Sequence, residues 1–210
     1  MKKLMMFFLS LAILPLITAQ ERAVTEKGDE VILNPDGTWE YVDKEILEAS
    51  AIPINPNRFF KDDKATFLLK SKKFNIGFWL DPKKWSFSKA VDNPDAEYEL
   101  VLKDEDAYAM IITERISMPI TTLRSIAIEN AMEAFSNLKI VEEEYRTVNG
   151  LEVLFLHMNL SVEGMKMSFY GYYYSNDSGT VQFVTFTSQN MIITYKSFLE
   201  SLLNGMVELD

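Results

Sequence analysis

Apolar and polar residues alternate along four consecutive runs between Ile140 and Met191. Each run is rich in β-branched and aromatic residues, and the runs are separated by Asn149-Gly150, Glu163-Gly164 and the stretch Asn176-Asp177-Ser178-Gly179. An Asn-Gly pair tolerates the positive φ angles that a two-residue type I′ hairpin needs. The pattern therefore predicts a meander of four antiparallel strands.

The two faces of this sheet follow from the period of two. The second run has a continuous apolar face, and its other face begins with Val153 and Phe155 and then becomes polar at His157 and Asn159. The third run has an apolar face that includes Phe169, and its opposite face has three tyrosines: Tyr170, Tyr172 and Tyr174. A sheet with this composition on both sides is expected to be covered on both faces.

Further strands and two helices are predicted around the meander. Residues 66–70 and 74–80 are strand-like, and the polar stretch 104–106 separates the alternating segments 97–103 and 107–114 into a hairpin. The period then changes to that of an amphipathic helix over residues 119–135, and again over 191–203. This order predicts an α+β fold, in which the helices cover the sheet from two sides or from one.

The first nineteen residues have the features of a secretory signal peptide. Lys2 and Lys3 precede an apolar run from Leu4 to Ile17, and Ala19 provides a small residue for cleavage. We expect an exported protein, periplasmic or extracellular, that is cleaved after Ala19 and has no stable membrane insertion; an uncleaved anchor is the less favoured alternative.

The remaining chain divides into three parts. Residues 20–43 predict a small β-hairpin appendage, because strand-like residues flank the turn Asn34-Pro35-Asp36-Gly37. Residues 44–65 contain Pro53 and Pro56 and no sustained period, which is typical of a linker, although 45–50 could form one helical turn. The main domain is expected over 66–210.

Charge and cysteine content exclude several classes of partner and chemistry. The 21 basic and 31 acidic residues give a net charge of −10, which argues against nucleic acid or anionic lipid as a partner. The absence of cysteine excludes disulfides, thiolate nucleophiles and thiolate metal sites. An exported chain without cysteine must therefore be stabilised by its packed core.

The order of these elements resembles the PsbP-like superfamily, including its DcrB-like bacterial periplasmic branch. The resemblance covers roughly residues 66–207 and rests on the Pro82-to-Trp85 turn, the hairpin, the helix, the meander and the closing helix. It implies an α/β/α sandwich with a central, mainly antiparallel sheet and an accessory or binding role, with no shared catalytic residues. The segment around Asp36-Gly37-Thr38-Trp39 separately resembles a short hairpin of exported bacterial proteins.

Candidate chemistry is sparse. His157, the single histidine, could act with Asn159 as a polar site, but one histidine without cysteine cannot form the usual zinc set, and a structural role is favoured. Asp92, Asn93 and Asp95 could form a calcium loop, yet the EF-hand spacing is absent and a solvated turn is favoured. No G-x-S-x-G turn is present, and nothing selects a catalytic carboxylate pair. We therefore expect no cofactor, no metal and no catalytic residue.

Aromatic residues are the best candidates for recognition. An exposed ladder of Tyr170, Tyr172 and Tyr174 would bind a protein or a flat ligand, and the alternative is that the helix from Pro119 covers it. Trp39 and Tyr41 of the appendage are further candidates.

Three functions follow. The leading hypothesis is an exported, non-enzymatic accessory or binding protein that contacts a protein partner in the cell envelope and exposes an apolar patch. The second is a small-ligand-binding protein or hydrolase with a pocket between sheet and helix, near His157 or the acidic loops. The third is a purely structural envelope protein.

Overall fold

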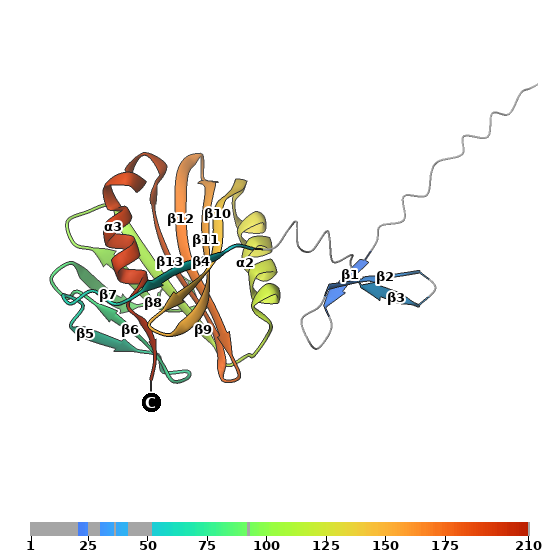
Figure 1. Ribbon diagram of the computed structural model, residues 1–210. Helices are drawn as coiled ribbons and strands as arrows, with labels where there is room; N and C mark the ends of the chain where they lie inside the picture. Colours follow the sequence, from blue (N-terminus) through green and yellow to red (C-terminus); the bar gives the residue numbers. More distant parts are fainter. Residues whose placement is uncertain (1–20, 25–29, 36, 42–51, 92, 210) are drawn as a thin grey trace, which may run out of the picture. The chain divides into compact units, whose positions relative to one another are not determined.

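The computed structural model describes residues 21–24, 30–35, 37–41, 52–91 and 93–209 (Figure 1). They divide into two compact units, one before and one after the boundary between Ser50 and Ala51. The expected signal peptide, residues 42–43 of the expected appendage and residues 44–51 of the expected linker lie outside the described residues.

The N-terminal unit is a small antiparallel sheet of three strands. Its order is β1-β2-β3, and the strands are β1 (Glu21–Val24), β2 (Glu30–Leu33) and β3 (Trp39–Tyr41). The β2–β3 turn is closed by the amide of Asn34, which donates to the carbonyl of Thr38 over 2.8 Å. Gly37 has a φ of 83°, which explains why glycine occupies this position of the turn.

The second unit is built on an eight-stranded sheet (Figure 1). Its order is β4-β10-β11-β12-β13-β9-β8-β7, and every neighbouring pair is antiparallel except β4 and β10. The strands are β4 (Ile54–Phe59), β7 (Trp85–Lys89), β8 (Ala96–Leu102), β9 (Ala107–Glu114), β10 (Ser136–Val148), β11 (Leu151–Val162), β12 (Met165–Asn176) and β13 (Gly179–Ser188).

The predicted meander is confirmed as β10 to β13. Asn149 and Gly150 connect β10 to β11 with φ angles of 49° and 89°, and Glu163 and Gly164 connect the next pair with 49° and 86°. Two consecutive residues with positive φ are the signature of the type I′ turn that the sequence predicted.

Strand β4 is the main departure from the expected organisation. It lies within the segment 44–65 that the prolines marked as a linker, but it pairs in parallel with β10 at the edge of the large sheet. Pro56 is compatible with this position because an edge strand does not need every amide as a donor. Half of the expected linker is therefore part of the main domain.

A second, smaller sheet and two α-helices complete this unit. The order of the small sheet is β14-β6-β5. The elements are β5 (Phe67–Lys70), β6 (Ile76–Leu80), α2 (Ile120–Ala134), the single 3-10 turn η1 (Gln189–Met191), α3 (Ile192–Leu203) and β14 (Met206–Glu208). Both α-helices agree with the amphipathic segments predicted from the sequence.

The large sheet has a separate core on each face. Val153 and Phe155 of β11 lie in the larger core together with α3 and the small sheet, whereas Leu154 and Leu156 lie in a second core under α2. The two helices therefore cover opposite faces, as an α/β/α sandwich requires.

None of the helices in the described part of the chain is long and apolar enough to cross a membrane.

Candidate functional site

The three candidate tyrosines of β12 are buried. Tyr170, Tyr172 and Tyr174 are 4%, 0% and 7% exposed and belong to the larger core. The helix from Pro119, which was expected to cover them, packs on the other face, where it covers Tyr173. Tyr170, Tyr172 and Tyr174 share their core with Tyr195, Leu199, Leu202 and Leu203 of α3 instead. The predicted exposed ladder is therefore wrong, because the closing helix and the small sheet cover this face.

A buried polar network, which sequence reasoning missed, passes through Tyr172. Arg146 is 6% exposed, pairs with Glu144 at 2.5 Å and donates to the Tyr172 hydroxyl at 3.3 Å. Tyr172 donates in turn to Asn204 Oδ1 at 2.7 Å, and Asn55 donates to Glu144 at 2.9 Å. Burial lowers the pKa of Arg146, but Tyr172 and Glu144 together raise it above its ordinary value. The network joins β4, β10, β12 and the end of α3, and we interpret it as structural.

His157 of β11 lies opposite Tyr170 of β12 on the same face of the large sheet, and it is 8% exposed. Its ring centroid is 4.3 Å from that of Tyr170, and its Nε2 atom has no hydrogen-bond partner. Burial lowers the pKa of His157. The neighbouring candidate Asn159 accepts a hydrogen bond from the Ser168 hydroxyl at 2.5 Å on the adjacent strand. These contacts are those of a neutral core histidine.

The appendage candidates are described only in part. The Trp39 side chain is 52% exposed on β3. Tyr41 ends this strand, and its side chain lies outside the described part of the structure.

A groove of about 740 Å³ lies between α2 and the sheet, and we call it the α2 groove. One wall is the stripe Ala127, Ala131 and Ala134, whose spacing places small side chains on one side of the helix. Apolar residues of four strands form the floor: Met110, Ile112, Met158, Leu160, Phe169, Tyr173 and Val184.

The groove exists because small residues face a sheet that extends beyond the helix. Helix α2 packs on β10 and β12, while Met110 and Ile112 of β9 are only half-buried (Figure 1). Alanines do not cover this edge of the floor, so Met110 and Ile112 remain partly accessible, while the other floor residues are buried. Such a surface is typical of a site that binds another molecule.

An aromatic row continues from the groove across the sheet. The centroid distances are 5.8 Å from Phe135 to Phe169, 5.2 Å from Phe169 to Phe186 and 5.6 Å from Phe186 to Tyr108. Tyr108 lines an adjoining shallow depression of about 840 Å³, and Met165, which is 60% exposed, lines it too. Sequence reasoning assigned Phe169 to a covered face, and its 8% exposure in the core under α2 agrees with that prediction.

Polar residues surround the groove, and those that are charged are all acidic. Asp95, Glu114 and Glu133 line it together with Asn93, Asn130 and Gln182, and no Lys or Arg is among its lining residues. Asn93 and Asp95 come from the proposed calcium loop, whose Asp92 lies outside the described residues. The Asn93 side chain accepts the Asp95 amide at 3.0 Å, which is the geometry of a turn. Among the described residues, no group of three acidic or histidine side chains could hold a metal ion.

Comparisons with known proteins concern the fold. No protein-family model and no curated protein matches the chain. The solution structure of cyanobacterial PsbP (CyanoP) from Synechocystis sp. PCC 6803 is similar with a TM-score of 0.53 and 14% identity, over 68% of this chain and 91% of that one.

Two further solved structures are more distant. PA94 from Pseudomonas aeruginosa, a protein of unknown function described as a putative regulator, has a TM-score of 0.46 and 11% identity over 69% of this chain and 97% of its own. LpqN, involved in cell envelope biogenesis of Mycobacterium tuberculosis, has a TM-score of 0.39 and 10% identity over 81% of this chain and 99% of its own. The order of strands and helices, together with the similarity to CyanoP, shows that the chain has the PsbP-like fold.

Proposed function

We propose that the chain is an exported, non-enzymatic accessory protein that binds a segment of another envelope protein in the α2 groove. The observation that carries this proposal is a groove in which Met110 and Ile112 are partly exposed on an apolar floor and whose rim bears carboxylates and no basic side chain. The sequence features of residues 1–19 support export. The absence of any motif for catalysis in the sequence supports a binding role.

The charge around the groove selects the kind of segment. Asp95, Glu114 and Glu133 favour lysine or arginine above the apolar floor, and the net charge of −10 attracts a basic partner from a distance. The occupant is therefore an amphipathic segment that places apolar side chains on Met110 and Ile112 and basic side chains at the rim. Removal of its apolar face from water provides affinity, and the charges provide selectivity.

Site-specific crosslinking in cells tests this function. A photo-crosslinking residue at Ala134, which is exposed in the groove wall, should capture one envelope protein, and mass spectrometry should place the crosslink in a basic amphipathic segment. The same residue at Ile193, which is 90% exposed on α3, is the matched control. Equal capture from both positions, no capture from Ala134, or a crosslink in an acidic segment would contradict the proposal.

Purified protein provides a second test with the identified segment as a peptide. Ile112→Lys places a cation on the groove floor and should weaken binding about tenfold or more, whereas Ile193→Lys should leave it unchanged. Binding should also weaken with salt, since the attraction to the rim is screened. Affinity that is equal in both variants would exclude the groove.

A further inference from the structure

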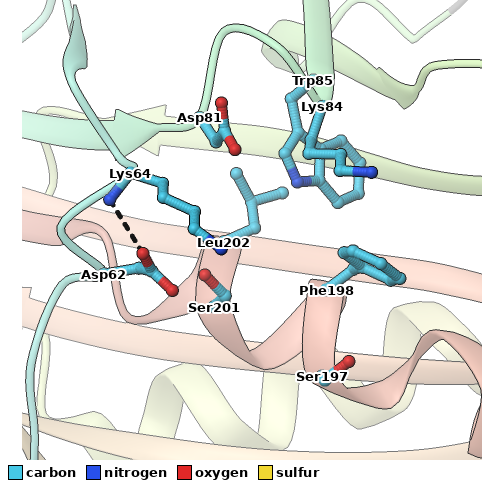
Figure 2. Close-up of a pocket in the computed structure, with 9 residues that line it drawn as sticks. All are labelled: Asp62, Lys64, Asp81, Lys84, Trp85, Ser197, Phe198, Ser201 and Leu202. Carbon is cyan, nitrogen blue, oxygen red and sulfur yellow. Dashed lines mark hydrogen bonds between the residues drawn. The ribbon is translucent and has the colours of Figure 1, made fainter.

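A smaller pocket on the other side of the large sheet has a different composition. Its volume is about 180 Å³, and it lies between α3, residues 62–64 and the turn 81–85 (Figure 2). It belongs to the side of the molecule where α3 packs, so it is separate from the α2 groove. The residues that line it are Asp62, Lys64, Asp81, Lys84, Trp85, Ser197, Phe198, Ser201 and Leu202.

The floor of this pocket is apolar. Trp85 and Leu202 are 4% and 2% exposed, and the half-buried Phe198 lies beside them. Lys84 Nζ lies 5.3 Å from the centroid of the Phe198 ring. A ligand here would therefore place an apolar body against Phe198 and Leu202.

Charged groups of both signs surround the floor. Figure 2 shows the carboxylate of Asp81 above the side chain of Lys64, with the hydroxyl of Ser201 below them. Asp62 and Asp81 each use one carboxylate oxygen to accept a backbone amide, from Lys64 and Lys83 respectively, both over 2.8 Å. These bonds fix the carboxylates and leave their other oxygens to a ligand.

The opposite charges do not neutralise one another. Within the part of the chain that the structure describes, no ion pair within 4.0 Å includes Asp62, Asp81, Lys64 or Lys84. Two carboxylates and two ammonium groups thus face one small space without pairing. A molecule that has both an ammonium and a carboxylate group can bind both kinds of charge at once.

We propose that this pocket binds a small zwitterion of amino-acid size, with its ammonium group at Asp81 and its carboxylate at Lys64. A cavity of about 150 Å³ holds a molecule as large as benzene, so a pocket of 180 Å³ has room for an amino acid. The Ser201 hydroxyl can donate to the ligand carboxylate or accept from its ammonium group. The site is independent of the α2 groove and of the function proposed there.

Titration of the purified chain with each standard L-amino acid, followed by calorimetry and by NMR of the Trp85 indole, tests the proposal. At least one amino acid should bind in the millimolar range or tighter and shift the Trp85 signal. Its decarboxylated amine and its deaminated acid should each bind at least about tenfold more weakly, because each lacks one of the two charges. Failure of every amino acid to bind, or equal affinity for the single-charge analogues, would overturn the proposal.

Variants then locate the site. Asp81→Asn keeps the acceptor for the Lys83 amide but removes the charge, and Lys64→Met removes the ammonium group; each should weaken binding about tenfold. Asp63→Asn and Lys83→Met change neighbouring charges that do not line the pocket and should bind like the unaltered chain. An effect of the same size in these controls would show that general electrostatics, and not this pocket, explains the binding.

Discussion

The Cζ atom of Arg146 lies 3.7 Å from the centroid of the Phe155 ring, so a guanidinium is stacked inside the larger core. The same group lies 4.8 Å from the centroid of Phe59 on β4. Arg146 therefore combines an ion pair with Glu144, a hydrogen bond with Tyr172 and contacts with two aromatic rings. A buried charge is tolerated in proteins when it is paired and hydrogen-bonded in this way.

Arg146→Ala should destabilise the main domain by about 3–5 kcal/mol, because it leaves the Glu144 carboxylate without its cation and exposes a cavity beside Phe155. Urea unfolding followed by near-UV circular dichroism measures the free energy of unfolding. Arg124→Ala is the matched control. The side chains of Arg124 and Glu143 are each about a quarter exposed, so their ion pair should contribute about 1 kcal/mol or less to stability. Equal losses in the two variants would contradict a special role for the buried network.

His157 should make stability depend on pH. Burial lowers its pKa in the folded chain below the ordinary 6.5, so the unfolded chain binds the proton more readily. The stability that the neutral imidazole contributes is fully present above the ordinary pKa of 6.5. It is lost as the pH falls through the lowered pKa of His157 in the folded chain. Two nearby charges have opposite effects on the pKa of His157: Glu142 raises it and Lys196 lowers it.

The measurement compares the unaltered chain with His157→Gln. Thermal unfolding between neutral and mildly acidic pH should show a smaller loss of stability in the variant, because this chain has no other histidine. Identical pH profiles would show that the imidazole is charged equally in the folded and unfolded states.

Asn149 should stabilise the fold beyond its role in the hairpin. Its Nδ2 atom donates to the carbonyls of Asn204 at 2.7 Å and Met206 at 2.8 Å, and its Oδ1 atom accepts the Lys61 amide at 3.0 Å. Asn149→Gly preserves the positive φ but removes all three hydrogen bonds, and should cost about 2–4 kcal/mol. Asn149→Asp keeps the acceptor for Lys61 but sets a carboxylate oxygen against the carbonyls of Asn204 and Met206, and should cost at least as much as Asn149→Gly.

Hydrogen exchange gives the readout for this prediction. Amides of β14 and of the end of α3 should exchange faster in Asn149→Gly, while those of the distant β8–β9 hairpin should not. Uniform acceleration throughout the domain would show that the variant only lowers global stability.

Gly171 should be needed for the conformation of Tyr173. A Cβ atom at this position would lie 2.9 Å from Cε2 of Tyr173, which is closer than real Cβ contacts allow. Gly171→Ala should therefore destabilise the chain by about 1–3 kcal/mol. The double variant Gly171→Ala, Tyr173→Leu removes the clashing ring, so the losses of the two single variants should not add in chemical denaturation. Strict additivity would show that the two side chains do not interact.

The sequence predicted the meander and both helices because long periodic segments and Asn-Gly turns are local signals. Tyr170 was misassigned for a physical reason: alternation shows that a residue shares a face with its neighbours but not which distant element covers that face. Strand β4 was missed because its pairing with β10 joins residues nearly ninety positions apart. The second hypothesis included a pocket between sheet and helix near an acidic loop, and Asn93 and Asp95 do line the α2 groove. The residues of its floor could not be predicted, since they depend on how far the sheet extends past a helix wall of alanines.

The two edges of the large sheet suggest how the chain avoids self-association. Pro56 interrupts the donors of β4 at one edge, and β7 at the other edge is short and ends in exposed Lys89. Neither edge offers the long, regular row of free donors and acceptors that another chain needs to extend the sheet. Such edges favour recognition through side chains in grooves over backbone pairing between copies, even where the chain is present at high concentration.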